Sequence, residues 1–286
     1  MRKKRVFPSK RYFGYKQNPP DDRDIRYRGP RFKKPPGLSD LKPIVLPVED
    51  QSVLGSCVGN GGTTQLETMW VKMGRPFTQM SRLGLYWLAR FLAGNVGEDA
   101  GCYPRDMAKA LVKFGCPEES LHPYNTRKYK ERPSDAAMEN ALAYRVEKYY
   151  WPKSLNDIKW ALSRGYPVGV GIQVFPCFEN PINGIVSMPP EDSENLGLHW
   201  IVICGHNDAT SYFDIVNSWG VSYGNNGFAK IPYKYIEKYG SDYLVLELGI
   251  NAPGFDPSPD LGVKWYIPVP LSKLWQWVKQ LLTKQA

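Results

Sequence analysis

The chain has 286 residues, of which 42% are hydrophobic, so it can bury a sizeable core and is not expected to be disordered. It has no run of about 18 consecutive apolar residues, which argues against a transmembrane helix. No apolar stretch follows the basic N-terminus, so we expect no secretory signal peptide. The length suits two lobes that share a cleft, or one domain with extensions.

The formal net charge of +9 is unevenly distributed. Residues 1–34 hold 13 of the 37 Lys and Arg residues and three of the 28 acidic ones, which leaves the remainder close to neutral. We predict that residues 1–40 form a basic, Pro-rich arm, extended because each proline disfavours helix in the residue before it. With its interleaved aromatics, residues 1–34 could bind a polyanion or an acidic protein partner, or simply form a loosely docked leader.

Hydrophobic spacing then predicts a series of helices. The first begins at Cys57 and ends at Gly74, and Ser81 is a predicted N-cap for the second. The predicted helices that follow the first span residues 81–94, 103–115 and 154–165, and Ser154 followed by Asp157 resembles a capping box at the start of the last one.

Short, β-rich segments punctuated by Gly, Pro and Asn follow these helices. They span residues 167–175, 199–207, 212–219, 227–232 and 243–249. Helices in one half and strands in the other predict an α+β fold with a cleft between the halves.

Beyond the strands, residues 251–286 combine a Pro-rich linker with an amphipathic helix predicted over residues 271–284. That helix can dock on the protein's own surface, in a partner's groove or on a membrane surface.

The five cysteines form no CxxC pair, so zinc-ribbon and thioredoxin-like readings are weak, and we expect no metal and no cofactor. Mostly reduced thiols indicate a reducing compartment. We therefore expect a cytoplasmic or virion-associated protein.

Four residues can supply the chemistry of a cysteine hydrolase, although each also has an ordinary structural reading. Cys57 begins a helix, whose N-terminus favours a thiolate, but a buried structural cysteine is about as common there. His199 starts a strand and is a candidate base, and Asn217 lies 18 residues on, where it can orient the imidazole. Gln51, six residues before Cys57, can donate to an oxyanion together with the Cys57 N–H.

The blocks "DQSVLGSC", "LHWIVICGHND" and "IVNSWGVSYGNNGFAKIP" together resemble the signature blocks of papain-like cysteine peptidases, in a divergent prokaryotic or viral form. The resemblance implies a helical lobe (about 51–165) and a β-barrel-like lobe (about 166–250) within a peptidase domain of residues 41–250, with an active-site cleft between them. It also implies a Cys57 nucleophile, a His199 base, an orienting Asn217 and an oxyanion donor Gln51. The pair of Cys57 and His199 should rest as thiolate and imidazolium.

Four further residues are candidates for binding substrate. Gly101 and Cys102 take the places of the family's glycine pair that binds the substrate backbone. Gly55 leaves room for a substrate backbone beside Cys57, and Trp219 can cover the bond between His199 and Asn217. The family's long inhibitory pro-domain does not fit into the short leader, although a short segment could lie along the cleft.

Departures from the family pattern keep alternatives open. Val58 replaces the usual tryptophan, Leu54 a disulfide-forming cysteine, Trp200 a small residue and Tyr223 a second tryptophan. Trp200 either reshapes the S′ side of the cleft or turns into the core. The main reading is an active thiol peptidase. The alternatives are a catalytically weak or inactive papain-like protein with a structural or assembly role, and a related thiol chemistry such as amide transfer or deamidation.

Overall fold

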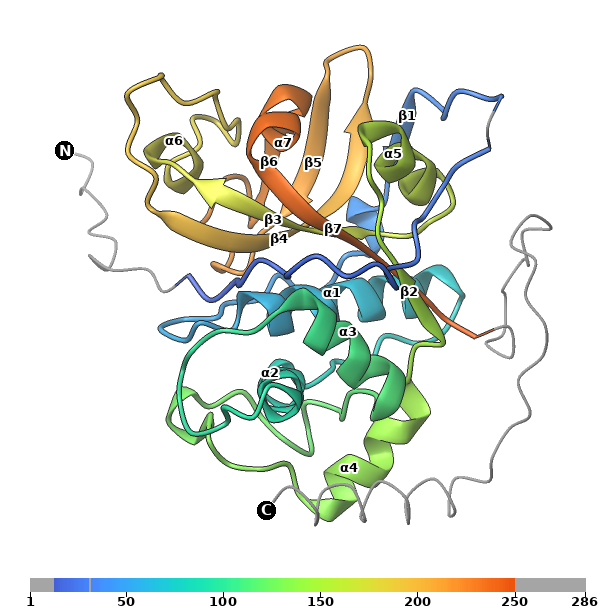
Figure 1. Cartoon of the computed structure of the whole chain (residues 1–286), viewed down its shortest axis with the longest axis vertical. Helices are drawn as coiled ribbons and strands as arrows, with labels where there is room; N and C mark the ends of the chain where they lie inside the picture. Colours follow the sequence, from blue (N-terminus) through green and yellow to red (C-terminus); the bar gives the residue numbers. More distant parts are fainter. Residues whose placement is uncertain (1–12, 31, 250–286) are drawn as a thin grey trace.

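The structure is a computed structural model that describes residues 13–30 and 32–249. The Pro-rich linker and the amphipathic helix expected after residue 250 lie outside the described residues, as does the start of the basic arm. Two lobes are visible, one built mainly from helices and one from a sheet with short helices around it (Figure 1).

The helices agree closely with those expected from the sequence, with three short ones added. The helices are α1 (Cys57–Lys72), α2 (Arg82–Leu92), α3 (Pro104–Lys113), α4 (Asp135–Ala141), α5 (Leu155–Ser163), α6 (Pro176–Glu179) and α7 (Tyr233–Tyr239). Short 3-10 helices span Lys42–Ile44, Thr126–Lys128 and Leu142–Tyr144. The predicted caps are confirmed, since the Ser81 hydroxyl accepts from Gly84 N and the Ser154 hydroxyl accepts from Asp157 N.

The strands form one antiparallel sheet in the order β2-β7-β3-β4-β5-β6, with β1 paired to β4. Their bounds are β1 (Leu38–Asp40), β2 (Lys148–Tyr150), β3 (Val168–Val174), β4 (Gly197–Asn207), β5 (Tyr212–Val216), β6 (Phe228–Pro232) and β7 (Gly240–Glu247). The long β4 pairs with β3 over Val168↔Ile203 to Val174↔Gly197, a register that places Ile172 opposite His199. The α+β, two-lobe papain-like architecture expected from the sequence is therefore present.

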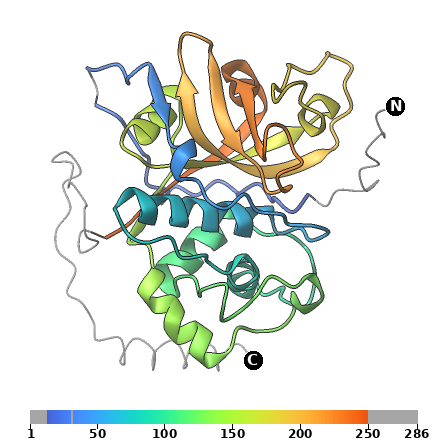
Figure 2. The same cartoon turned by 180° about the vertical axis from the view of Figure 1, so that it is seen from behind.

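Each lobe has its own hydrophobic core. The helical core collects side chains of α1, α2 and α3, such as Leu66, Leu85 and Leu111. The sheet core includes Val170 and Ile203. Helix α5 falls within the range expected for the helical lobe, but its apolar face (Ile158, Ala161, Leu162) packs into the sheet core, because the connection after β2 has already crossed to that lobe (Figure 2).

The arm does not lie loosely on the surface. Residues 13–30 run between the two lobes as an extended segment without helix (Figure 1). Tyr15 and Tyr27 are both only 4% exposed, and they join the helical core and the sheet core respectively. This part of the arm is therefore integral to the packing, in contrast to the loosely docked leader considered from the sequence.

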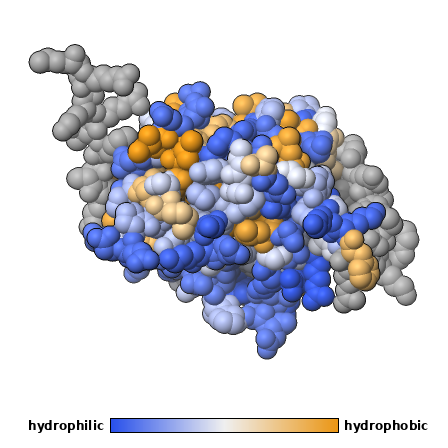
Figure 3. All heavy atoms as spheres, turned by 90° about the horizontal axis from the view of Figure 1, so that it is seen from above, coloured by the Kyte–Doolittle hydropathy of each residue, from blue (hydrophilic) through white to orange (hydrophobic). Residues whose placement is uncertain are grey.

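The surface seen from above the sheet lobe is mostly hydrophilic, with hydrophobic side chains in small separate groups (Figure 3). Large exposed hydrophobic residues of the described chain are far apart in sequence and include Phe32, Ile182 and Val221. Among the described residues, no helix is both long and apolar enough to cross a membrane.

Candidate active site

Cys57 is the first residue of α1, and its side chain is fully buried. The turn before it is fixed by Asn60, whose side-chain amide donates to the Ser56 carbonyl (2.9 Å) and hydroxyl (3.0 Å). The hydroxyls of Ser56 and Tyr124 lie 2.6 Å apart, and Tyr124 also donates to the Gln51 carbonyl at 2.8 Å. The thiol therefore sits at a helix N-terminus that side chains hold rigidly from two directions.

A hydrogen-bonded frame connects this turn to the segment around Gly101. The Asp99 carboxylate accepts from Gly55 N, at 3.1 Å to each oxygen, and from the Tyr86 hydroxyl at 2.5 Å. The same Tyr86 hydroxyl accepts from Gly101 N at 3.1 Å. Asp99 and Tyr86 thus fix the spacing of two expected substrate-binding glycines. Neither positioning residue was predicted from the sequence, although Asp99 is only two residues before Gly101.

His199 and Asn217 are in direct contact. Nε2 of His199 lies 2.7 Å from Oδ1 of Asn217. The same Asn217 oxygen accepts from the backbone N–H of Ser218 at 2.8 Å, which identifies this side-chain atom as the oxygen. Since an amide oxygen only accepts, Nε2 carries the imidazole hydrogen, and Nδ1 is the nitrogen that can exchange a proton with another group.

Aromatic rings enclose this pair. The Trp219 ring stacks on the imidazole, with centroids 4.6 Å apart and planes inclined by 28°. Phe178 packs on both rings, at 6.2 Å from His199 and 5.5 Å from Trp219. The contact between His199 and Asn217 therefore lies in a water-poor environment, as expected for Trp219 from the sequence.

Gln51 reaches the site through the turn that follows β5. Its backbone N–H donates to the Ser218 carbonyl at 2.9 Å, and its side-chain oxygen accepts from the Ser218 hydroxyl at 2.7 Å. Its amide nitrogen donates to the Leu54 carbonyl at 2.9 Å. These bonds join the segment before Cys57 to the segment that carries Asn217, so the four expected catalytic residues come from two lobes that are held together at this point.

The arm lies directly over Cys57. Gly14 is packed so closely that a Cβ built on it would be 1.7 Å from the Gly55 carbonyl oxygen. Cys102 N donates to the Gly14 carbonyl (3.0 Å) and Lys16 N to the Cys102 carbonyl (3.2 Å), so Tyr15 and Cys102 form a parallel bridge. We call residues 13–16 the cleft segment. The four expected substrate-binding residues all touch it or the His199 ring: Gly55, Gly101, Cys102 and Trp219.

This coverage changes the state of the thiol. Burial raises the pKa of Cys57 to about 11, and the backbone N–H groups of Trp200, Gly14 and Val58 act in the opposite direction without cancelling it. The resting thiolate expected from the sequence is therefore not the state of this structure. The physical reason is the cleft segment, which removes solvent from a group that the helix N-terminus would otherwise help to ionise.

The other histidines and cysteines have structural surroundings. Burial lowers the pKa of His122 and of His206, and the buried His206 lies beside Tyr233 and Asp208. All five cysteines are free thiols, and Cys177 alone is not fully buried. No cluster of three or more metal-ligating side chains occurs within residues 13–30 and 32–249.

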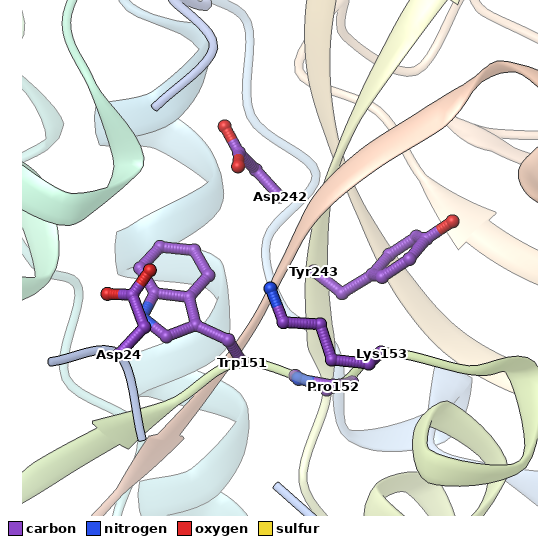
Figure 4. A pocket seen from close by; sticks show the side chains of 6 residues that line it. All are labelled: Asp24, Trp151, Pro152, Lys153, Asp242 and Tyr243. Carbon is purple, nitrogen blue, oxygen red and sulfur yellow. The ribbon is translucent and has the colours of Figure 1, made fainter. Parts of the chain in front are cut away.

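A cavity of about 130 Å³ is lined in part by Asp242, which also accepts a hydrogen bond from Tyr15 of the cleft segment. Its charged lining residues come from three segments: Asp24 from the arm, Lys153 from the connection between β2 and α5, and Asp242 from β7 (Figure 4). Asp242 and Tyr243 point in opposite directions from β7, so Asp242 faces the arm.

Comparison with known proteins agrees with this geometry. Residues 38–244 match the family model described as papain family cysteine protease. The chain belongs to the papain family of cysteine proteases. It is thus a papain-like thiol peptidase, as the three sequence blocks indicated.

Two sequence relatives show how similar this papain-like chain is to other proteins. It is 32% identical to the uncharacterized peptidase C1-like protein L477 of Acanthamoeba polyphaga mimivirus, covering 87% of this chain and 91% of the viral protein. It is 26% identical to human cathepsin L2, but the match spans 72% of this chain and only 63% of the cathepsin.

Among solved structures, the papain-like chain is similar to xylellain, a cysteine protease from Xylella fastidiosa. The TM-score is 0.78 at 26% identity, and the match covers 85% of this chain and all of xylellain. The likeness to xylellain extends through both lobes of the fold.

Proposed function

We propose that this papain-like peptidase hydrolyses peptide bonds through Cys57, His199 and Asn217, with Gln51 as an oxyanion donor. The observation that supports this most is the 2.7 Å contact between His199 and Asn217 in the lobe that faces the N-terminus of α1. The contact fixes the imidazole so that Nδ1 is available as the acceptor of the thiol proton.

The reaction then follows from the positions of these groups. Nδ1 of His199 takes the proton from Cys57, and the sulfur attacks the carbonyl carbon of a peptide. The imidazolium protonates the leaving amine, which departs and leaves an acyl group on Cys57. Water, activated by the same imidazole, then releases the acid and restores the thiol.

The developing oxyanion needs donors on the opposite side of the carbonyl. The Cys57 N–H, unbonded within α1 because it belongs to the first turn, is one. The side-chain amide of Gln51, six residues before Cys57 in the chain, is the proposed second donor. One such donor typically contributes about 10²–10³-fold to kcat.

The cleft segment keeps this machinery latent. In a productive peptide the leaving nitrogen faces His199, so the part of the peptide that follows it must pass His199 and Trp219. In the cleft segment this position is occupied by Phe13, whose ring lies 6.1 Å from the His199 ring. Phe13 precedes Gly14 in the chain. The segment therefore crosses the thiol in the direction opposite to a substrate, which explains how it can fill the site without being cut.

Hydrolysis of fluorogenic peptides by the full chain carrying Gly14→Val tests the proposal, because that change removes the cleft segment from Cys57. We expect turnover that Cys57→Ala abolishes while the melting temperature stays nearly unchanged. Turnover that survives Cys57→Ala would assign the reaction to another group. An intact fold without any turnover would favour the alternative of an inactive papain-like protein with an assembly role.

The expected partners and location of the protein are also proposals. Peptide or protein substrates follow from the family, whereas a polyanion or acidic partner of residues 1–34 rests on charge alone. Contacts of the helix predicted over residues 271–284 with a partner or a membrane surface rest on its sequence pattern alone. The viral relative and the five free thiols support a cytoplasmic or virion-associated location.

A further inference from the structure

The side chain of Tyr15 fills a pocket beside Cys57. The residue is 4% exposed, and its ring packs on Trp200 with centroids 5.6 Å apart. Gly171 forms the opposite wall, where a Cβ would come within 2.1 Å of the Tyr15 ring. Only a glycine in β3 leaves room for an aromatic ring at this depth.

The end of the pocket is polar and acidic. The Tyr15 hydroxyl donates to Oδ2 of Asp242 at 2.8 Å, and it lies 2.8 Å from the Ser241 hydroxyl. The same carboxylate oxygen accepts from Asn18 N at 2.6 Å. A buried aromatic side chain with a hydroxyl thus finds both an apolar wall and a charged acceptor here, whereas phenylalanine would leave the acceptor without the hydroxyl donor.

The pocket belongs to the substrate path, because Tyr15 is adjacent in the chain to Gly14, which covers Cys57. A substrate running in the productive direction would place the residue that is attacked at the position of Gly14. Its preceding residue would then enter the Tyr15 pocket, while its backbone would pair with Cys102 as Tyr15 does. We propose that this pocket, lined by Gly171, Trp200, Ser241 and Asp242, selects tyrosine at the position before the attacked residue.

This inference rests on the proposed peptidase function and names its substrate preference. Tyrosine is favoured over a basic side chain because cations already face Asp242. Arg105 of α3 interacts electrostatically with the Asp242 carboxylate, although it is also paired with Asp24 at 2.7 Å, and Lys153 lines the cavity beside Asp242 (Figure 4). A third positive charge would be repelled by these two, whereas a neutral hydroxyl donor is not.

The test uses the full chain opened by Gly14→Val and Tyr15→Ala. Four fluorogenic peptides differ only in the residue before the attacked one, which is tyrosine, phenylalanine, arginine or alanine. We expect kcat/KM for the tyrosyl peptide to exceed that for the phenylalanyl peptide about tenfold or more, because a hydrogen bond to a charged acceptor is gained. Equal values for the two peptides, or a preference for arginine, would overturn the inference.

Two pocket variants locate the origin of the preference. In the opened chain, Asp242→Asn should reduce the tyrosine-to-phenylalanine ratio severalfold, and asparagine tolerates the φ of +50° at this position. Gly171→Ala should lower kcat/KM of both aromatic peptides at least tenfold relative to the alanyl peptide. The matched control Asp192→Asn removes the same charge from an exposed loop and should leave the ratio unchanged.

A binding measurement separates this inference from the proposed chemistry. With Cys57→Ala added to the opened chain, calorimetry compares the tyrosyl and phenylalanyl peptides without turnover. Tighter binding of the tyrosyl peptide by about tenfold supports the pocket even if no variant hydrolyses anything, in which case only the catalytic proposal fails. Equal binding rejects the pocket even if hydrolysis is observed.

Discussion

Substituting Gly14 by valine should open the active site. The Cβ of any residue at this position would lie 1.7 Å from the Gly55 carbonyl oxygen, a backbone atom that the Asp99 frame holds in place. Because the Cβ would meet a backbone atom, no side-chain movement relieves the clash, and we expect the cleft segment to leave Cys57. The thiol then regains solvent and the influence of the helix N-terminus.

The size of the effect follows from the pKa of the thiol. With the segment in place the pKa is about 11, so at pH 7 about one molecule in 10⁴ carries a thiolate. At the ordinary value of 9.0 that fraction is about one in 10². Opening should therefore accelerate alkylation of Cys57 about 100-fold, and more if His199 ionises the thiol further.

The assay is timed alkylation with iodoacetamide at pH 7, followed by mass spectrometry of each cysteine. Cys177, which is partly exposed, serves as the internal reference. Gly37→Val is the matched control, since a Cβ there meets only Asp208 at an ordinary 3.8 Å. An unchanged rate at Cys57, or an equal increase in the control variant, would refute the assignment of residues 13–16 as the block.

The raised pKa of Cys57 also predicts that the closed state, in which the cleft segment covers the thiol, depends on pH. The closed state holds the thiol proton more tightly than the open state, so closure is strongest below the open-state pKa. It should weaken up to tenfold per pH unit as the pH rises from there towards 11. Partial proteolysis of residues 1–30 at pH 7 and pH 10 measures this, and equal protection at both values would contradict it.

Three further predictions concern other parts of the molecule. In the opened chain, Gln51→Ala should lower kcat about 10²–10³-fold with little change in KM, whereas a change confined to KM would argue against an oxyanion role. Glu67→Gln should raise the melting temperature by about 2–4 °C at pH 7 and hardly at pH 4, with the exposed Glu139→Gln as control. Burial raises the pKa of Glu67 well above its usual range, so the folded state loses stability as the pH rises from 4.5, and a pH-independent gain would contradict this. Replacing the four basic residues at positions 2–5 by glutamine should lower the salt concentration that elutes the chain from heparin, and unchanged elution would sink the electrostatic reading of the arm.

Local signals predicted much of the fold. Ser81 and Ser154 cap helices as expected. A capping hydroxyl bonds to a backbone N–H of the first helical turn, so the two partners are close in sequence as well as in space. The β-branched residues of β3 and β4 likewise reflect burial along most of the length of each strand. By contrast, β2 spans only Lys148–Tyr150, and so short a strand is defined by its pairing with β7 rather than by its own pattern.

The residues of the active site also divide into those that the sequence predicted and those that it did not. Cys57, His199, Asn217 and Gln51 were predicted because family blocks carry them at fixed spacing. Asp99, Tyr86 and Tyr15 were not, since their roles arise from contacts across the molecule that no local pattern encodes.

Trp200 shows how tertiary packing decides an open alternative. It is 1% exposed and packs in the helical core, yet it also forms one wall of the Tyr15 pocket. Of the two alternatives considered from the sequence, the one in which Trp200 turns into the core is therefore observed. The outcome depends on a ring contact with a residue of the arm 185 positions earlier in the chain, far beyond any sequence window.

The central claim is that Cys57 is the nucleophile, and covalent trapping tests it most directly. The full chain carrying Gly14→Val is treated with a peptidyl electrophile that reacts only with a thiolate positioned beside a peptide, and the adduct is mapped by mass spectrometry. We predict one adduct per chain, on Cys57, formed at a rate that His199→Ala lowers. An adduct on Cys177 or another cysteine, or a rate that does not depend on His199, would contradict the account.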